Sequence, residues 1–282
     1  MPEGDNVLRV ATVLGREITG RTVDRIEIQD LGVVRELAGT SVEEVAARGK
    51  HMLVRFAAGW TLRVHLGMHG TWRRRHVRER SPRNPTIDIV VGETAYYCLR
   101  SYRAELIRSD RVEGHVRVGR LGPDLLAEPP DIDEAVRRAK KRGNAMREIG
   151  DLVMDQRVAA GIGNIYKSET LFECRIHPRA RVGELTDDQL GAIYATAARL
   201  MRLNLLTRRR AAVPLRRRPT PSSQRFWVYM RAGKPCLDCG TRVERFLQGD
   251  MARSTYFCPR CQPGDSGESR QSGESGQSRE SR

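Results

Sequence analysis

The chain has 282 residues, of which 39% are hydrophobic and 30% charged, which is enough for two folded domains and a small appendage. No stretch approaches the roughly 18–20 apolar residues of a membrane span, and residues 1–5 lack the basic and apolar run of a secretory signal, so we expect a cytoplasmic protein. The formal net charge of +15 favours a polyanionic partner, of which nucleic acid is the commonest.

The first predicted element is a helix near the N-terminus. Its apolar residues recur at helical spacing between residues 7 and 14. Asp5 is placed to cap the start of this helix, and Gly15 to end it.

Short strands follow the helix. They lie between turns rich in Gly, Asn and Pro and are predicted at residues 51–56, 61–66, 86–91 and 94–99. In the second of these strands, alternation places Leu62, Val64 and Leu66 in a core and turns Arg63 and His65 outward.

These elements predict an α+β chain with two larger domains. Residues 1–122 form a β-sandwich with flanking helices, three prolines in residues 123–130 mark a linker, and residues 131–225 form a helical domain. The helices of the second domain are predicted at residues 133–141, 146–155, 163–174 and from 186 onward. Thr186 and Gln189 form a capping box at the start of the last helix.

Two segments have the composition of irregular chain. Residues 204–223 are rich in Arg and Pro, and we expect a mobile loop there. Residues 264–282 contain no apolar side chain, so we expect a disordered tail.

Residues 226–263 are predicted to form a zinc finger. Two Cys-x-x-Cys pairs separated by 18 residues suit a tetrahedral four-thiolate site for one Zn²⁺. The ligands are Cys236, Cys239, Cys258 and Cys261. Residues 242–247 and 255–258 are predicted strands of a β-hairpin whose arginines can follow a phosphate backbone. Because four thiolates leave no open position on the metal, the zinc is predicted to be structural.

The N-terminus itself offers a nucleophile. Removal of Met1 leaves a secondary amine at Pro2, and an α-amino group titrates near about 7.7–8.0, so part of it is unprotonated at neutral pH. The Glu3 carboxylate beside it is a possible proton acceptor. An amine that attacks a sugar C1′ expels a base and leaves an iminium, which permits elimination of a phosphate.

Six sequence blocks occur in the order found in one known family. They are Met1-Pro2-Glu3-Gly4-Asp5, Arg48-Gly49-Lys50-His51, His65-Leu66-Gly67-Met68-His69-Gly70, Leu121-Gly122-Pro123-Asp124-Leu125-Leu126, the run from Asp155 to Tyr166, and the four-cysteine finger. Over residues 1–263 they resemble the formamidopyrimidine-DNA glycosylase/endonuclease VIII family. The Pro-Glu-Gly-Asp start is most similar to the actinobacterial endonuclease VIII members.

The resemblance implies four catalytic residues. Pro2 attacks C1′, Glu3 handles protons at the opening sugar, and Lys50 acts as general acid and phosphate contact. Asp124 matches an acidic residue with an auxiliary catalytic role, for which an ordinary linker turn is the alternative.

The resemblance also implies the DNA contacts. His65 meets a backbone phosphate, and Met68 and His69 fall where the family inserts its wedge into the duplex. Asn164 and the backbone N–H groups of residues 160–164, in the helix-two-turns-helix (H2TH) motif, approach a phosphate. Arg253 grips the phosphate of the flipped nucleotide.

The function that the resemblance implies is that of a bifunctional DNA glycosylase and abasic-site lyase of base excision repair. It removes oxidised bases, pyrimidines favoured because residues 204–223 differ from the purine branch, and nicks the strand by β,δ-elimination through a Schiff base. The alternatives are a preference for oxidised purines, such as 8-oxoguanine and formamidopyrimidines, or a non-catalytic zinc-finger protein that binds damaged DNA. We expect damaged double-stranded DNA as partner, a nucleoid-associated monomer, no membrane contact and no small-molecule cofactor.

Overall fold

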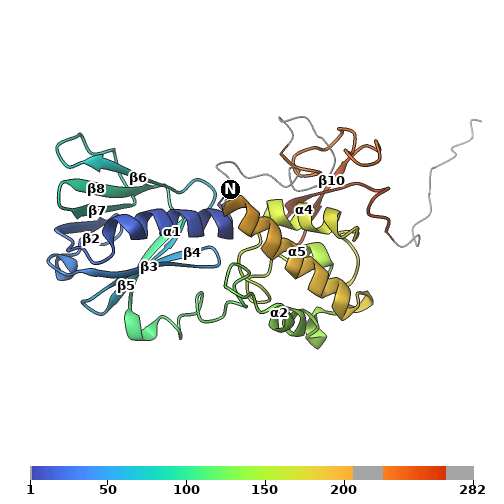
Figure 1. Ribbon diagram of the computed structural model, residues 1–282, viewed down its shortest axis with the longest axis horizontal. Coiled ribbons are helices and arrows are strands. Elements are labelled where there is room, and N and C mark those ends of the chain that lie inside the picture. Colours follow the sequence, from blue (N-terminus) through green and yellow to red (C-terminus); the bar gives the residue numbers. More distant parts are fainter. Residues whose placement is uncertain (1, 206–224, 265–282) are drawn as a thin grey trace, which may run out of the picture.

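The computed structural model describes residues 2–205 and 225–264, which form a β-rich half and a helical half joined by a linker (Figure 1). Met1, nearly all of the predicted Arg-rich loop and the predicted tail lie outside these residues. Helix α1 (Gly4–Ile18) begins at the junction of the two halves and runs along the β-rich half (Figure 1). The chain therefore carries its first residues to the boundary between the halves.

Helix α1 is longer than predicted, and the predicted cap at its start is not formed. It continues through Gly15 to Ile18, because Gly15 packs against strand β3 (Val42–Arg48), where an added Cβ would lie 3.3 Å from the Cβ of Val45. Asp5 does not cap the helix; it is buried in the first turn and accepts a hydrogen bond from the Tyr166 hydroxyl at 2.8 Å. The glycine thus serves close packing rather than helix termination.

Two antiparallel sheets make up the β-rich half. One has the order β2-β1-β7-β8-β6, formed by β2 (Gly32–Val33), β1 (Arg25–Ile28), β7 (Ile87–Val91), β8 (Thr94–Leu99) and β6 (Thr71–His76). The other has the order β3-β4-β5-β9, formed by β3 (Val42–Arg48), β4 (His51–Phe56), β5 (Trp60–His65) and β9 (Arg103–Arg108). The four predicted strands correspond to β4, β5, β7 and β8 within one residue at each end.

The core of the β-rich half lies between the sheets and under α1. Leu62, Val64 and Leu66 are buried in it, as predicted. The prediction for Arg63 was wrong: only 1% of this residue is exposed, and its guanidinium pairs with Glu105 at 2.6 Å and donates to His51 Nδ1 at 2.8 Å. Arg63 on β5 is therefore covered by polar partners, one of them the charged Glu105, rather than by water.

The helical half contains α2 (Ile132–Ala139), α3 (Ile149–Leu152), α4 (Asn164–Glu173) and α5 (Asp187–Leu205). Short 3₁₀ turns lie at Arg35–Leu37, Ser109–Arg111, Arg142–Asn144 and Val182–Glu184. The capping box of α5 is confirmed, with Thr186 N–H donating to Gln189 at 2.8 Å and Gln189 N–H donating back at 3.2 Å.

One helix prediction was wrong in extent. Residues 146–155 were expected to be helical, but only Ile149–Leu152 is. Glu148 lies in an extended bridge with Arg181, and Asp155 turns back to accept hydrogen bonds from the backbone and guanidinium of Arg157. Local side-chain bonding of this kind competes with the helix.

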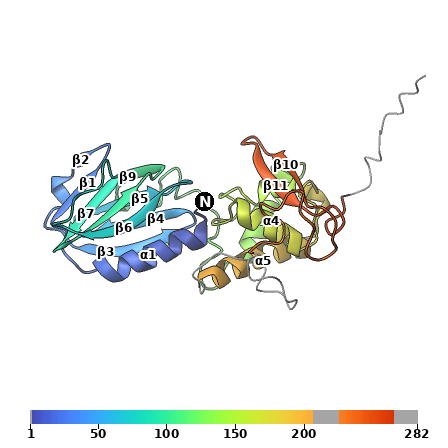
Figure 2. The same ribbon diagram turned by 90° about the horizontal axis from the view of Figure 1, so that it is seen from above.

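The third part of the fold is the hairpin of β10 (Glu244–Gln248) and β11 (Arg253–Phe257), which packs on α4 (Figure 2). Its cysteines share one hydrophobic cluster with the helices, whereas the β-rich half has a cluster of its own. In the part of the chain that the structure describes, no helix has the length and hydropathy to cross a bilayer.

Candidate active site and DNA-binding interface

A cavity of about 360 Å³ lies between the two halves of the molecule. Five of the predicted residues line it, namely Pro2, Lys50, His65, Met68 and Arg253. The structure thus brings together residues from the chain start, two loops of the β-rich half and the finger hairpin. Glu3, Asn164 and Asp124 are not among the residues that line the cavity.

Glu3 is fully buried and holds the start of α4. Its two carboxylate oxygens accept hydrogen bonds from the backbone N–H groups of Gly163 at 3.0 Å, Ile165 at 2.8 Å and Tyr166 at 3.3 Å. A carboxylate is favoured at this place because the first N–H groups of a helix lack partners within the helix. The residue after the candidate nucleophile is therefore anchored to the helical half.

This arrangement bears on the phosphate contact expected of residues 160–164, because some of the donors in and beside this segment already have partners. The backbone donors of Gly163 and Ile165 are occupied by Glu3, and the Asn164 side-chain amide donates to the Ser254 carbonyl at 2.7 Å. The amide oxygen of Asn164 is buried without a hydrogen-bond partner among the described residues. Asn164 thus joins α4 to the finger hairpin, and its contact with a phosphate stays a prediction.

Lys50 follows a turn that glycine makes possible. Gly49 has φ +57°, and an added Cβ there would lie 2.9 Å from the Cβ of Ala160. The Gly49 N–H donates to the Asp124 carboxylate at 2.7 Å, and Asp124 also accepts from the Leu126 N–H at 2.9 Å. Asp124 is therefore placed to position the turn that carries Lys50, and it does not line the cavity.

The electrostatics of the cavity keep the Lys50 amine easy to deprotonate. Burial is the main cause that lowers the pKa of Lys50 to about 8; the charge of Glu3 opposes this shift, and the charge of Arg253 adds to it. Such a lysine can donate a proton near neutral pH more readily than an exposed one.

His65 lies in a cluster of rings at the end of β5. Its ring centroid is 5.1 Å from that of His51 and 5.7 Å from that of Tyr102. Burial, with Arg63 nearby, lowers the pKa of His65 to about 4 and that of His51 to about 3. Both rings are therefore neutral in the free protein at physiological pH.

The predicted wedge loop is exposed. Met68 has 59% of its surface exposed at the mouth of the cavity, and His69 beside it is exposed but does not line the cavity. Met251, at the tip of the finger hairpin, is 73% exposed and lines the same cavity. Two flexible apolar side chains therefore border the opening from opposite halves.

Several cavity residues were not predicted from the sequence, among them Arg147, Asp151, Lys167 and Gln248. Arg147 pairs with Asp151 at 2.7 Å and with Asp155 at 3.0 Å. One of the missed residues had a usable signal: Lys167 lies three residues after Asn164, so the two share a face of α4.

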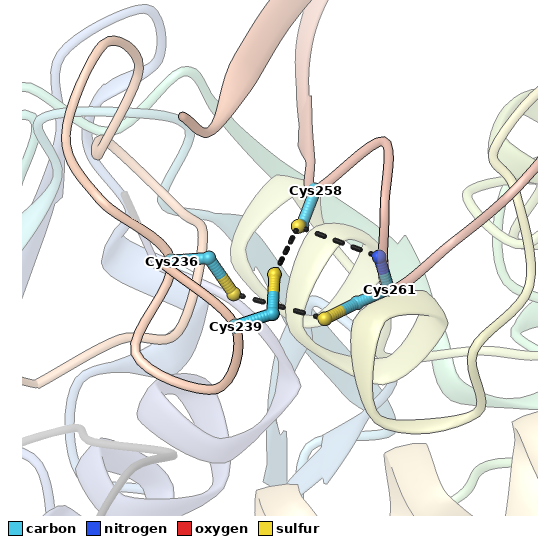
Figure 3. A group of neighbouring side chains, drawn as sticks. All are labelled: Cys236, Cys239, Cys258 and Cys261. Atoms are coloured by element: carbon cyan, nitrogen blue, oxygen red, sulfur yellow. Dashed lines mark hydrogen bonds between the residues drawn. The ribbon is translucent and has the colours of Figure 1, made fainter. Parts of the chain in front are cut away.

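The four cysteines of the finger converge, as Figure 3 shows. Their sulfur atoms all lie within 4.8 Å of one another, with Cys236 and Cys261 at 3.8 Å and Cys239 and Cys258 at 3.5 Å. Tetrahedral Zn–S bonds of about 2.3 Å separate sulfurs by about 3.8 Å, so the thiolates fit a metal ion of this size. Backbone N–H groups of Asp238 and Cys261 point at sulfurs, each at 3.4 Å, as in a closed four-sulfur site.

Comparison with known families matches both halves of the chain. Residues 1–104 match the family described as "Formamidopyrimidine-DNA glycosylase N-terminal domain", and residues 121–211 match "Formamidopyrimidine-DNA glycosylase H2TH domain". The fold and the cavity therefore have the form of a DNA-repair glycosylase.

Similar proteins over almost the whole chain support this class. "Probable endonuclease 8 2" of Streptomyces coelicolor is 38% identical, over 94% of this chain and 95% of its own length. "DNA-(apurinic or apyrimidinic site) lyase Nei2" of Mycolicibacterium smegmatis is 33% identical, over 93% of this chain and 99% of its own. The chain belongs to the formamidopyrimidine-DNA glycosylase/endonuclease VIII family.

Solved structures share the fold. The Lactococcus lactis formamidopyrimidine-DNA glycosylase, bound non-covalently to DNA with an abasic site, has a TM-score of 0.78 and 23% identity over 93% of this chain and 100% of its own. The predicted fold class, a mixed α/β chain with N-terminal sheets, an H2TH domain and a four-cysteine cluster, is confirmed.

Proposed function

We propose that this protein is a bifunctional DNA glycosylase and abasic-site lyase that removes oxidised bases from duplex DNA in the cytoplasm, with the Pro2 amine as nucleophile after removal of Met1. The observation that carries the proposal is the meeting of Pro2 and Lys50 with Arg253 on one cavity, beside the buried carboxylate of Glu3. A nucleophile, a proton donor and a phosphate-binding cation are the parts that the reaction needs.

The chemistry begins with the Pro2 nitrogen, which forms a bond to C1′ of the damaged nucleoside and gives up its proton to a nearby base. The glycosidic bond breaks, its electron pair leaves with the base, and the base takes up a proton. Ring opening then moves the C1′–O4′ pair onto O4′, which is protonated, and leaves an iminium between Pro2 and C1′. Lys50, with its lowered pKa, and Glu3 are the proton carriers of these steps.

Strand cleavage follows from the iminium, because it accepts electrons. Loss of a C2′ proton expels the phosphate from C3′, and loss of a C4′ proton expels the second phosphate from C5′. Water hydrolyses the remaining iminium and frees the amine. The products are a one-nucleotide gap with a phosphate at each end.

The substrate is a base with oxidative damage, and we favour oxidised pyrimidines. The support is the name endonuclease 8, which several relatives from actinobacteria carry. The rival preference, oxidised purines, is favoured by relatives named formamidopyrimidine-DNA glycosylase, such as that of Laribacter hongkongensis at 31% identity. Cleavage rates on duplexes that each carry a single oxidised pyrimidine or a single oxidised purine distinguish the two preferences.

The finger metal is proposed to be one Zn²⁺, held by Cys236, Cys239, Cys258 and Cys261, which supplies no chemistry to the reaction. Four thiolates close its coordination sphere. Its role is to hold the hairpin that carries Arg253.

The test of the proposed function is reductive trapping. Borohydride added to the protein with a duplex that contains an abasic site reduces the iminium to a stable amine, so a covalent protein–DNA adduct is expected. A form that retains Met1 has no free amine at Pro2 and should give no adduct. Equal trapping by the Met1-retaining form excludes Pro2 as nucleophile, and absence of any adduct excludes the imine mechanism.

A further inference from the structure

A second lysine lies in the wall of the cavity, and the reaction steps above give it no role. Lys167 is on α4, one turn after Asn164, and only 1% of its surface is exposed. It lines the same cavity as Pro2 and Lys50. Lysine is almost never fully buried without a partner, so this position calls for a physical reason.

The partner that the structure gives Lys167 is neutral. Its Nζ donates to the Thr255 hydroxyl at 2.6 Å, and among the described residues no carboxylate forms an ion pair with it. Asp151, the acid that raises its pKa most, is a partner of Arg147 instead. An ammonium has three N–H donors, so two remain for another ligand.

In the described part of the chain, four cationic side chains line this cavity, and one of them, Arg147, is paired with Asp151 and Asp155. Of the other three, Arg253 repels both Lys50 and Lys167. Burial lowers the pKa of Lys167 to about 8, with Asp151 opposing the shift and Arg253 adding to it. Arg253 lowers the pKa of Lys50 as well. An anion bound among Lys50, Lys167 and Arg253 would relieve this repulsion and give the buried ammonium a charged partner.

We propose that Lys167, with Lys50 and Arg253, binds a phosphate monoester that strand cleavage leaves at the gap. This inference rests on the proposed function for the origin of the monoester, but its binding is measured separately. A monoester carries about −1.5 to −2 charges against −1 for an intact phosphodiester, so three cations distinguish the cleaved end from the intact strand. The ligand is either the 3′-phosphate or the 5′-phosphate of the gap.

The test compares four duplexes with a one-nucleotide gap, which carry a 3′-phosphate, a 5′-phosphate, both or neither. Binding is measured at one salt concentration near pH 7 with the full chain. The wild-type protein is expected to bind one of the phosphorylated ends at least about tenfold more tightly than the gap without phosphates, the size of one charge-assisted hydrogen bond. The duplex that is bound more tightly shows whether the 3′-phosphate or the 5′-phosphate is the ligand.

Two substitutions test the lysine. Lys167→Gln keeps a donor for Thr255 but removes the charge, and it should lose most of the preference; Lys167→Arg keeps the charge and should retain it. Lys141→Met, which removes an exposed lysine outside the cavity, is the matched control and should behave as wild type. Metal content and the thermal transition establish that each variant is folded.

Three outcomes overturn the proposal. The first is a wild-type protein that binds all four gaps equally, a result that stands even if the Gln variant fails to fold. The second is an unchanged preference in Lys167→Gln, and the third is an equal loss of affinity for all four duplexes, which assigns Lys167 to the packing of the finger. Borohydride trapping by the wild type, run in parallel, reports on the lyase reaction independently of these measurements.

Discussion

At the scale of single residues, the position of Lys50 depends on hydrogen bonds that lie outside the cavity. Asp124 receives the N–H of Gly49 and that of Leu126, so it ties the linker to the turn that carries the lysine. We therefore expect Asp124→Ala to lower the single-turnover cleavage rate by about tenfold or more, the value of one hydrogen bond to a charged group. Asp124→Asn keeps one oxygen acceptor and should recover part of the rate. Rates at wild-type level in Asp124→Ala would assign Asp124 to an ordinary linker turn.

The pKa values of the two cavity lysines, Lys50 and Lys167, predict how stability and DNA affinity depend on pH. Their pKa values lie near 8 in the folded protein against the ordinary lysine value of 10.5, so between these values the unfolded chain binds more protons. The free protein should therefore gain stability as the pH rises through this window. DNA binding favours the charged amines, so affinity for a duplex with a stable abasic-site analogue should fall over the same range. A double variant, Lys50→Arg with Lys167→Arg, should show a flatter pH profile of affinity, and a profile as steep as that of wild type would remove both lysines from the phosphate contacts.

The N-terminal amine of Pro2 could be identified from its own chemistry, whereas Lys50 and Arg253 were identified through the resemblance to a known family. Pro2, Lys50 and Arg253 stood out through motifs, and they meet on one cavity. Lys167 was missed because a lysine on a helix is ordinarily a solvated surface residue, and only the tertiary structure buries it. Arg63 was misplaced for a related reason, since alternation along a strand reports which face a side chain takes but not what covers that face.

At the scale of elements, the contact between the chain start and the beginning of α4 leaves no space for a side chain at Gly163. A Cβ added to Gly163 would lie 2.4 Å from the Glu3 carboxyl carbon. Gly163→Ala should therefore displace the buried carboxylate and lower trapping and cleavage by more than about tenfold. Gly143→Ala is the matched control, because nothing lies within 4 Å of its added Cβ. Equal activity of the two variants would show that the placement of Glu3 is not needed.

Metal removal tests the role of the finger. The finger is too small to fold by its own core, and its sulfurs converge on one point. We expect a strong chelator to release one zinc per chain, to abolish DNA binding through loss of the Arg253 hairpin, and to allow recovery when zinc is restored. Full binding of DNA by the metal-free protein would contradict this role.

Regular elements were predicted well where hydrophobic periodicity was clean, as in β4, β8 and α5. Strands β1, β2, β3, β6 and β9 were not predicted. Strand β3 is interrupted by charged residues, and β6, at a sheet edge, contains three arginines in succession. The helix predicted at residues 146–155 was longer than α3, because Glu148 and Asp155 make contacts outside the helix that the sequence pattern does not encode. In each case a tertiary contact overrode the local preference.

At the scale of the whole molecule, the two hydrophobic clusters are separate. One belongs to the β-rich half, and the other joins the helices to the finger around Trp227, whose ring stacks on Phe172 at 5.6 Å. We expect calorimetry to resolve two unfolding transitions, of which only one moves to lower temperature when zinc is chelated. A single transition that shifts as a whole would mean that the contacts between the halves make them one cooperative unit.

The anchoring of Glu3 on α4 has a consequence for the timing of assembly. Since the chain start is held by three backbone hydrogen bonds from the other half, the residue that precedes it reaches the cavity when the protein folds, before any DNA arrives. With Pro2 as the proposed nucleophile, the entropy of positioning its amine is lost when the protein folds, and the site is already assembled when a damaged nucleotide leaves the duplex.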